Sequence, residues 1–223
     1  MPIHLHPTAE LAPRVMLPGD PGRALLLAQE LLEEPRMFNH NRGLWGYSGL
    51  ARDGEPLTIQ STGMGGPSAA IVVSELIELG ARRLLRVGTC GALAPASLGE
   101  LLAVREALVQ DGTSRALGAD GRALPTARLA AALGRSARAV TVVSTDLFYD
   151  ERAGIEAAWA AAGAHAVEME AATLFALAAR HGCEAAALLI VSDLVLPTRA
   201  RIDTEALRAA ERRAGEVALA ALA

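Results

Sequence analysis

The fold of this chain is expressed most clearly in one stretch, Leu57-Thr-Ile-Gln-Ser-Thr-Gly-Met-Gly-Gly-Pro-Ser-Ala-Ala-Ile-Val-Val-Ser-Glu-Leu-Ile-Glu-Leu79. Leu57–Ser61 is a short β-rich run, and Ser68–Leu79 has the apolar periodicity of an amphipathic helix. The glycines between them form a turn, and Pro67 suits the first turn of a helix. A strand, a tight turn and a helix in this order are typical of an α/β sheet.

The same alternation continues along the chain. Apolar strands between amphipathic helices favour a sheet that is buried on both faces. We therefore predict a single domain over residues 1–223, of α/β class, with a central mixed, mostly parallel sheet flanked by helices on both faces. Asp111–Arg128, rich in Gly, Ala and Arg, has the composition of an excursion or loop, and its structure stays undecided at this stage. The predicted strands are Arg14–Leu17, Leu57–Ser61, Arg83–Val87, Val140–Ser144 and Ala187–Val191, and the predicted helices are Gly22–Leu32, Ser68–Leu79, Glu151–Ala162, Ala171–His181 and Thr204–Leu222.

Composition limits the possible functions. A chain of 223 residues with 52% hydrophobic content is long enough for one large core. The net charge of −4 gives no reason to expect a nucleic-acid-binding protein, because such proteins present positively charged surfaces to the phosphate backbone. All 21 basic residues are Arg, so a Schiff-base lysine and a Walker-type phosphate loop are excluded.

Cysteine usage and hydropathy indicate a cytoplasmic protein. Cys90 and Cys183 provide neither a disulfide framework nor metal-ligand spacing, and no His/Cys/Asp cluster predicts a metal site. The N-terminus has no charged-then-apolar leader, and apolar runs such as Ala185–Val191 are too short to cross a bilayer. We expect no membrane partner.

Chemistry-bearing residues follow the predicted strands. Gly19-Asp-Pro-Gly-Arg23 offers backbone N–H groups and a guanidinium to an anion, and Arg86-Val-Gly-Thr-Cys-Gly91 offers a similar set. Thr62–Ser68 is a third glycine turn, and Ser192-Asp193 follows an apolar run. Any one such turn is more often structural than ligand-binding, and Asp193 alone could be a helix N-cap. Their convergence at one edge of a sheet favours a ligand site.

A carboxylate pair adds a second kind of chemistry. Val167-Glu-Met-Glu-Ala-Ala172 places Glu168 and Glu170 beside Met169. These acids could be a solvated helix start, where the macrodipole favours negative charge. Together with the anion-binding turns, they suggest a pocket that grips sugar hydroxyls near a phosphate.

The chain resembles nucleoside phosphorylase family I, and within it the bacterial hexameric purine enzymes. The resemblance covers residues 18 to 193, with the motifs in the family's order. It implies phosphorolysis of purine (deoxy)ribonucleosides, with inorganic phosphate as co-substrate and no cofactor. The motifs are Pro18-Gly-Asp-Pro21, Thr62–Leu76, Arg86–Gly91, Ser144-Thr-Asp-Leu-Phe-Tyr149, Val167–Ala172 and Val191-Ser-Asp193.

The resemblance implies that one set of residues binds phosphate and that two residues reach a neighbouring subunit. Gly19, Arg23, Arg86 and Thr89 would bind phosphate, with Thr89 in place of the family's usual Ser. In the implied homohexamer, a trimer of dimers, Arg42 and His4 would complete the neighbour's phosphate and ribose sites. Phe38, Trp45 and Tyr47 near Arg42 fit such an interface, and a core hairpin explains them equally well.

The resemblance also implies how the nucleoside is held. Met64, Glu168, Met169 and Glu170 would line the ribose, and Phe148 would flank the nucleoside. Cys90, Gly91, Ser192 and Asp193 would meet the base. Glu170 would accept hydrogen bonds from the ribose hydroxyls and tolerate the positive charge that develops on the sugar. Asp193 would protonate N7 of the purine or donate a hydrogen bond to it.

Several alternatives remain open at this stage. Uridine phosphorylases share the fold, but Phe148–Gly154 does not supply their pyrimidine-binding pair. Methylthioadenosine/S-adenosylhomocysteine nucleosidases use water and lack the phosphate arm, and a non-catalytic nucleoside-binding protein would not need all these groups. The preferred purine stays undecided, as does the arginine that assists Asp193. The candidate arginines are Arg199, Arg201 and Arg208.

Overall fold

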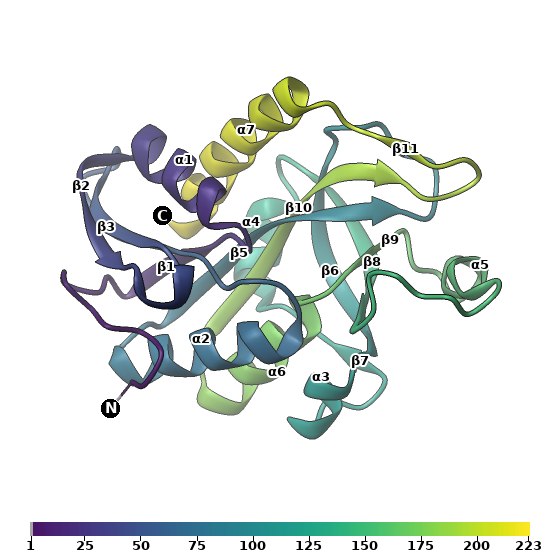
Figure 1. Cartoon of the computed structure of the whole chain (residues 1–223), viewed down its shortest axis with the longest axis horizontal. Coiled ribbons are helices and arrows are strands. Elements are labelled where there is room, and N and C mark those ends of the chain that lie inside the picture. The colour runs from purple at the N-terminus through teal and green to yellow at the C-terminus, as the bar shows by residue number, and fades with distance from the viewer. Residues whose placement is uncertain (1) are drawn as a thin grey trace.

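One mixed sheet runs through the middle of the computed structural model, which describes residues 2–223, and helices cover both of its faces (Figure 1). The α/β fold with a mixed sheet is therefore confirmed. The helices are α1 (Pro21–Leu31), α2 (Gly66–Leu79), α3 (Gly112–Ala116), α4 (Ala127–Leu133), α5 (Ile155–Ala161), α6 (Ala171–His181) and α7 (Thr204–Leu222), with a 3-10 turn at Asn41–Gly43. The strands are β1 (Arg14–Leu17), β2 (Leu32–Asn39), β3 (Gly46–Ala51), β4 (Pro56–Gln60), β5 (Arg83–Ala92), β6 (Leu101–Gln110), β7 (Arg122–Ala123), β8 (Arg138–Thr145), β9 (Ala166–Glu168), β10 (Glu184–Leu194) and β11 (Ala200–Arg201).

Part of the sheet closes on itself. Strand β5 pairs in parallel with β10, and β10 pairs antiparallel with β6. Strand β6 pairs in parallel with β8 and β8 with β9, and β9 returns to β5 in an antiparallel pairing. Strands β1, β4, β3 and β2 extend this ring beyond β5. The parallel strands β1, β4, β5 and β10 have their carboxyl ends at one edge, which is where ligands gather in such sheets, and antiparallel β9 pairs with the end of β5 there.

The central strands are buried on both faces because their side chains alternate between two cores. Along β10, Ala185, Ala187 and Leu189 enter the core under α2 and α6, whereas Ala186 and Leu188 enter the core under α1, α4 and α7. The small Ala side chains let helices lie close to the sheet, as the low aromatic content predicts.

Five predicted strands and five predicted helices have counterparts in the structure, and α6 and α7 have the predicted bounds. The segment Asp111–Arg128, whose structure the sequence leaves undecided, contains α3, β7 and the start of α4. Strand β6 was not predicted. Its sequence LLAVREALVQ is rich in Leu and Ala, which favour a helix, and its register shifts between Val104 and Glu106.

The pair β2–β3 was also not predicted as strands. It buries Phe38 completely and leaves Tyr47 only 7% exposed, so these aromatics belong to the core, while Trp45 remains 38% exposed. Across residues 2–223, none of the helices has the length and apolar character needed to span a membrane.

Candidate active site

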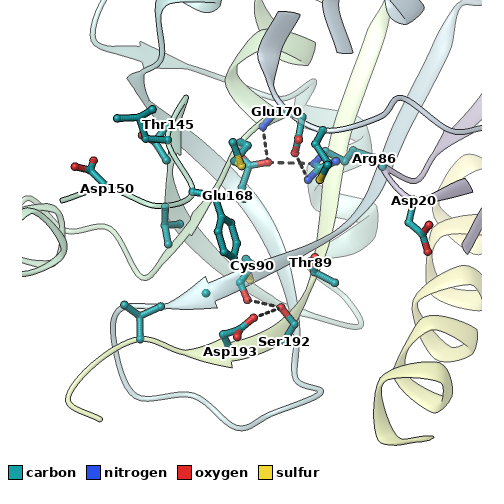
Figure 2. Close-up of a pocket in the computed structure, with 18 of the residues that line it drawn as sticks. Asp20, Arg86, Thr89, Cys90, Thr145, Asp150, Glu168, Glu170, Ser192 and Asp193 are labelled. Atoms are coloured by element: carbon teal, nitrogen blue, oxygen red, sulfur yellow. Dashed lines mark hydrogen bonds and ion pairs between the residues drawn. The ribbon is translucent and has the colours of Figure 1, made fainter. Parts of the chain in front are cut away.

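A cavity of about 420 Å³ opens where β1, β4, β5, β8, β9 and β10 end. It gathers residues from turns that are far apart in the sequence, as Figure 2 shows for its polar side chains. Among the predicted site residues, those that line it are Gly19, Arg23, Met64, Arg86, Thr89, Cys90, Gly91, Phe148, Glu168, Met169, Glu170, Ser192 and Asp193.

The turn after β1 forms one end of the cavity. Asp20 is the N-cap of α1, and its carboxylate accepts hydrogen bonds from the backbone N–H groups of Gly22 and Arg23, each at 3.0 Å. Gly19 approaches the next turn closely, since a Cβ there would lie 3.1 Å from the carbonyl oxygen of Gly63. A helix N-terminus with a buried guanidinium at Arg23 is suited to an anion.

Arg86 joins this end to the carboxylate pair. Its Nε donates to Oε2 of Glu168 at 3.1 Å, and its Nη2 forms an ion pair with Glu170 (Figure 2). All three side chains are at least nine-tenths buried. The guanidinium thus lies between the two carboxylates and next to the cavity.

Glu168 is held by many donors. Ser144 Oγ donates to Oε1 of Glu168 at 2.5 Å, and the backbone N–H groups of Glu170 and Ala171 donate to the same carboxylate at 2.9–3.0 Å. Its side chain therefore caps α6 rather than pointing freely into solvent. Ser144 belongs to a motif of the sequence, but no role was predicted for it.

Glu170 is bound less completely than Glu168. Its Oε1 accepts from the backbone N–H of Gly65 at 2.5 Å, which ties it to the glycine turn before α2. Burial raises the pKa of Glu170; Arg86 opposes this effect and the nearby Glu168 adds to it.

The opposite end of the cavity carries Ser192 and Asp193. A register shift between Val191 and Asp193 in the β10–β5 pairing forms an irregularity at Ser192. Ser192 Oγ donates to Oδ2 of Asp193 at 2.8 Å and also lies 3.3 Å from the Cys90 carbonyl oxygen. Asp193 is part of β10, so the N-cap interpretation is wrong.

Two arginines lie near this acid. Arg199 lines the cavity, and Nε of Arg201 lies 3.9 Å from Oδ1 of Asp193. Arg208 is exposed on α7 and is not among the residues lining the cavity. Burial raises the pKa of the neighbouring Cys90 thiol, which therefore stays protonated.

Apolar side chains surround the mouth of the cavity. Met64 is 85% exposed and Phe148 is 64% exposed. The Phe148 ring contacts that of Tyr149 edge-on, with centroids 5.0 Å apart. Such exposed aromatics are unusual unless a ligand or another chain covers them.

His4 and Arg42 do not line the cavity of their own chain. They lie together elsewhere, because the Asn41 side-chain amide donates to the His4 carbonyl oxygen at 2.8 Å. Arg42 is exposed and has a left-handed backbone with φ of 57°. Nδ1 of His4 lies 2.7 Å from Oε1 of Glu75 on α2.

Sequence reasoning missed further residues of the site. Trp159, Thr145 and Val195 line the cavity. Glu211 of α7 accepts a hydrogen bond from Nε of Arg23 at 2.7 Å. Thr145 lies in the quoted motif Ser144–Tyr149, although no role was predicted for it. The other three stand in no glycine turn, acid pair or quoted motif, so no local signal marks them. Over the described residues, 2–223, no group of three or more His, Cys, Asp and Glu side chains could hold a metal ion.

The strand ends of this α/β sheet therefore bring arginines that suit an anion next to carboxylates that suit sugar hydroxyls. The family model described as the phosphorylase superfamily matches residues 13–223, and the chain belongs to this superfamily. This confirms the family expected from the motifs.

Named relatives define the similarity further. The chain is 40% identical over 200 residues to a DeoD-type purine nucleoside phosphorylase of Geobacillus kaustophilus, covering 85% of this chain and 84% of the relative. It is 36% identical over 195 residues to the DeoD-type enzyme of Caldanaerobacter subterraneus, covering 82% and 84%. Among solved structures, uridine phosphorylase from Vibrio fischeri is similar with a TM-score of 0.87 and 27% identity, covering 100% of this chain and 98% of that chain.

Proposed function

We propose that the protein catalyses the reversible phosphorolysis of purine (deoxy)ribonucleosides, giving free purine base and (deoxy)ribose 1-phosphate. The observation that carries this proposal is the position of Arg86, which lines the cavity while it is ion-paired with both Glu168 and Glu170. One guanidinium thereby links an anion-binding end to the carboxylates that suit a sugar. The two DeoD-type relatives support purine nucleosides as the substrate class.

Inorganic phosphate is the nucleophile in this proposal. Gly19, Arg23, Arg86 and Thr89 bind it at the β1 and β5 ends of the cavity. One phosphate oxygen forms a bond to the anomeric carbon while the bond from that carbon to the purine nitrogen breaks. The electron pair of the broken bond goes to the base, and the sugar inverts at this carbon.

The ribose lies between the phosphate and the base. Glu170 accepts hydrogen bonds from the 2′- and 3′-hydroxyls and stabilises the positive charge that develops on the ring. Glu168 fixes Arg86 and the start of α6, and Met64 and Met169 cover the sugar. Phe148 flanks the nucleoside.

The base lies against the end of β10. Asp193 gives its proton to N7 of the purine, so that the base leaves as a neutral species and the acid regains a proton from solvent. If Asp193 donates only a hydrogen bond, the base leaves as an anion that takes its proton from solvent. Ser192, Cys90 and Gly91 contact the base. Arg201 is the arginine nearest to Asp193, at 3.9 Å, and we assign it the assisting role ahead of Arg199 and Arg208.

The active oligomer is a homohexamer in this proposal, a trimer of dimers. His4 and Arg42 share one surface, away from their own cavity, because Asn41 bridges their segments. In the assembly they enter the neighbouring cavity, where Arg42 contacts phosphate and His4 contacts the ribose 5′-hydroxyl.

The first experiment is a cleavage assay with inosine, guanosine, adenosine, methylthioadenosine and uridine, each with and without inorganic phosphate. Purine release that requires phosphate and yields ribose 1-phosphate supports the proposal. Phosphate-dependent uracil release would favour uridine phosphorolysis instead. Purine release without phosphate would make the protein a hydrolase.

A further inference from the structure

The buried ion pair between Arg23 and Glu211 joins two segments that are 188 residues apart in the sequence. Nε of Arg23 lies 2.7 Å from Oε1 of Glu211, and both side chains are only 8% exposed. Arg23 lines the cavity, whereas Glu211 is absent from its lining. Glu211 therefore contacts Arg23, a residue proposed to bind phosphate, but does not itself line the cavity where phosphate would bind.

This ion pair restricts how Arg23 can present its donors. The Arg23 backbone N–H is held by the carboxylate of Asp20, and Nη1 lies 3.4 Å from the carbonyl oxygen of Val87. A guanidinium has N–H donors along two edges, and Glu211 occupies the Nε position. Since Nη1 also donates to the Val87 carbonyl, Nη2 and the second N–H of Nη1 remain for an anion, in a fixed orientation.

The packing of α7 against α1 brings Glu211 to this position. Gly215 is one turn further along α7, and a Cβ there would lie 2.6 Å from Cδ2 of Leu27 and 3.2 Å from Cδ1 of Leu31. The absence of a side chain at Gly215 thus lets the two helices come close. That approach places Glu211, a long acid in an otherwise small and apolar contact, against Arg23.

We infer that Glu211 is a positioning residue for phosphate binding, which holds the Arg23 guanidinium in the orientation that the anion requires. The inference rests on the proposed function, since it takes Arg23 as a phosphate ligand. Removing the carboxylate leaves Nε of a buried guanidinium without its acceptor, with only the long Nη1 contact to the Val87 carbonyl to hold the side chain's orientation. Phosphate affinity then falls, while nucleoside binding at the other end of the cavity is kept.

The test compares variants of Glu211 in full steady-state kinetics with inosine and phosphate. Glu211→Ala is expected to raise the KM for phosphate by roughly tenfold or more, the usual consequence of losing a charged hydrogen bond. The KM for inosine stays within about twofold, since Glu211 is remote from the nucleoside. Glu211→Gln keeps an oxygen at the same reach, so it recovers most of the phosphate affinity.

Glu216→Gln is the matched control. Glu216 lies on the same helix and pairs with Arg52 at 2.8 Å, but both of these side chains are more than half exposed. Its kinetics should equal those of the unmodified protein.

A second measurement, the rise in melting temperature caused by phosphate alone, reports binding without turnover. It should shrink in Glu211→Ala and persist in Glu211→Gln. If Glu211→Ala does not fold, Glu211→Asp replaces it, because the shorter carboxylate keeps the charge but withdraws from Nε; it should raise the phosphate KM similarly.

Unchanged or lower phosphate KM in the Ala or Asp variant would overturn the inference, as would equal losses for phosphate and inosine. Failure of the proposed function has a different signature, because the unmodified protein would then cleave nucleosides independently of phosphate and gain no thermal stability from it.

Discussion

Gly88 follows Arg86 by two residues on β5, and a Cβ at Gly88 would lie 2.6 Å from Nη2 and 2.7 Å from Cζ of Arg86. Residues two apart on a strand share a face, so the arginine side chain folds back over the glycine. The orientation in which Arg86 meets Glu168 and Glu170 depends on this empty position.

Gly88→Ala should therefore disable the site while leaving the fold intact. The added methyl group forces the guanidinium away from both carboxylates, with an overpacking cost of about 1–3 kcal/mol. We expect kcat/KM for phosphate to fall at least tenfold in the cleavage assay. Gly112→Ala is the control, since its Cβ would meet nothing nearer than 3.5 Å. A Gly88→Ala protein with full activity would mean that Arg86 has room to move.

Asp193→Asn tests the acid. The amide cannot supply a proton to N7, so turnover of inosine should fall by ~10²–10⁴-fold. A nucleoside whose base is already activated, such as 7-methylinosine, needs no such proton and should lose far less. Both substrates are measured at saturating phosphate. Equal losses on the two would remove Asp193 from the acid role.

The local parts of this site could be predicted from the sequence. A glycine turn after an apolar run is a short-range signal, and so is the pair Glu168 and Glu170 before a helix. The structure places these groups around one cavity because β1, β4 and β5 are parallel and end at the same edge of the sheet, where antiparallel β9 pairs with the end of β5.

Contacts that depend on helix docking could not be predicted in this way. Glu211 reaches Arg23 only because α7 packs on α1, and no spacing in the sequence reports that approach. Strand β6 was missed for a related reason. Its Leu and Ala residues favour a helix locally, whereas pairing with β8 and β10 imposes a strand.

Arg42 provides a prediction about the assembly. Arg42→Ala should raise the KM for phosphate, although Arg42 lies outside the cavity of its own chain. Co-expression with Asp193→Asn chains should restore part of the activity, because a mixed pair contains one site with an intact Asp193 and an intact neighbouring Arg42. A forced monomer with normal phosphate affinity, or an absence of complementation, would refute the shared site.

Glu75 holds the N-terminal segment through several donors at once. Its carboxylate accepts from the backbone N–H groups of Ile3, His4 and Leu5 at 2.7–3.1 Å and from the His4 ring at 2.7 Å. Burial by itself would raise the pKa of Glu75, but these hydrogen bonds outweigh it and lower the pKa from 4.5 to about 2.

The sign of this shift fixes the pH dependence of stability. Because the folded pKa lies below the unfolded one, the carboxylate stabilises the fold fully above pH 4.5, and this contribution is lost as pH falls towards about 2. The Glu75→Gln variant has no ionisable carboxyl group at this position. Its free energy of unfolding, measured with denaturant, should be lower than that of the unmodified protein at pH 7. Between pH 7 and pH 3 it should also fall by less. Arg14 and Asp53 form a second acid-sensitive pair, with the pKa of Asp53 lowered to about 2, so some acid loss should persist in the variant. If the free energy of unfolding falls equally in the two proteins between pH 7 and pH 3, Glu75 is not ionised when it binds the N-terminal segment.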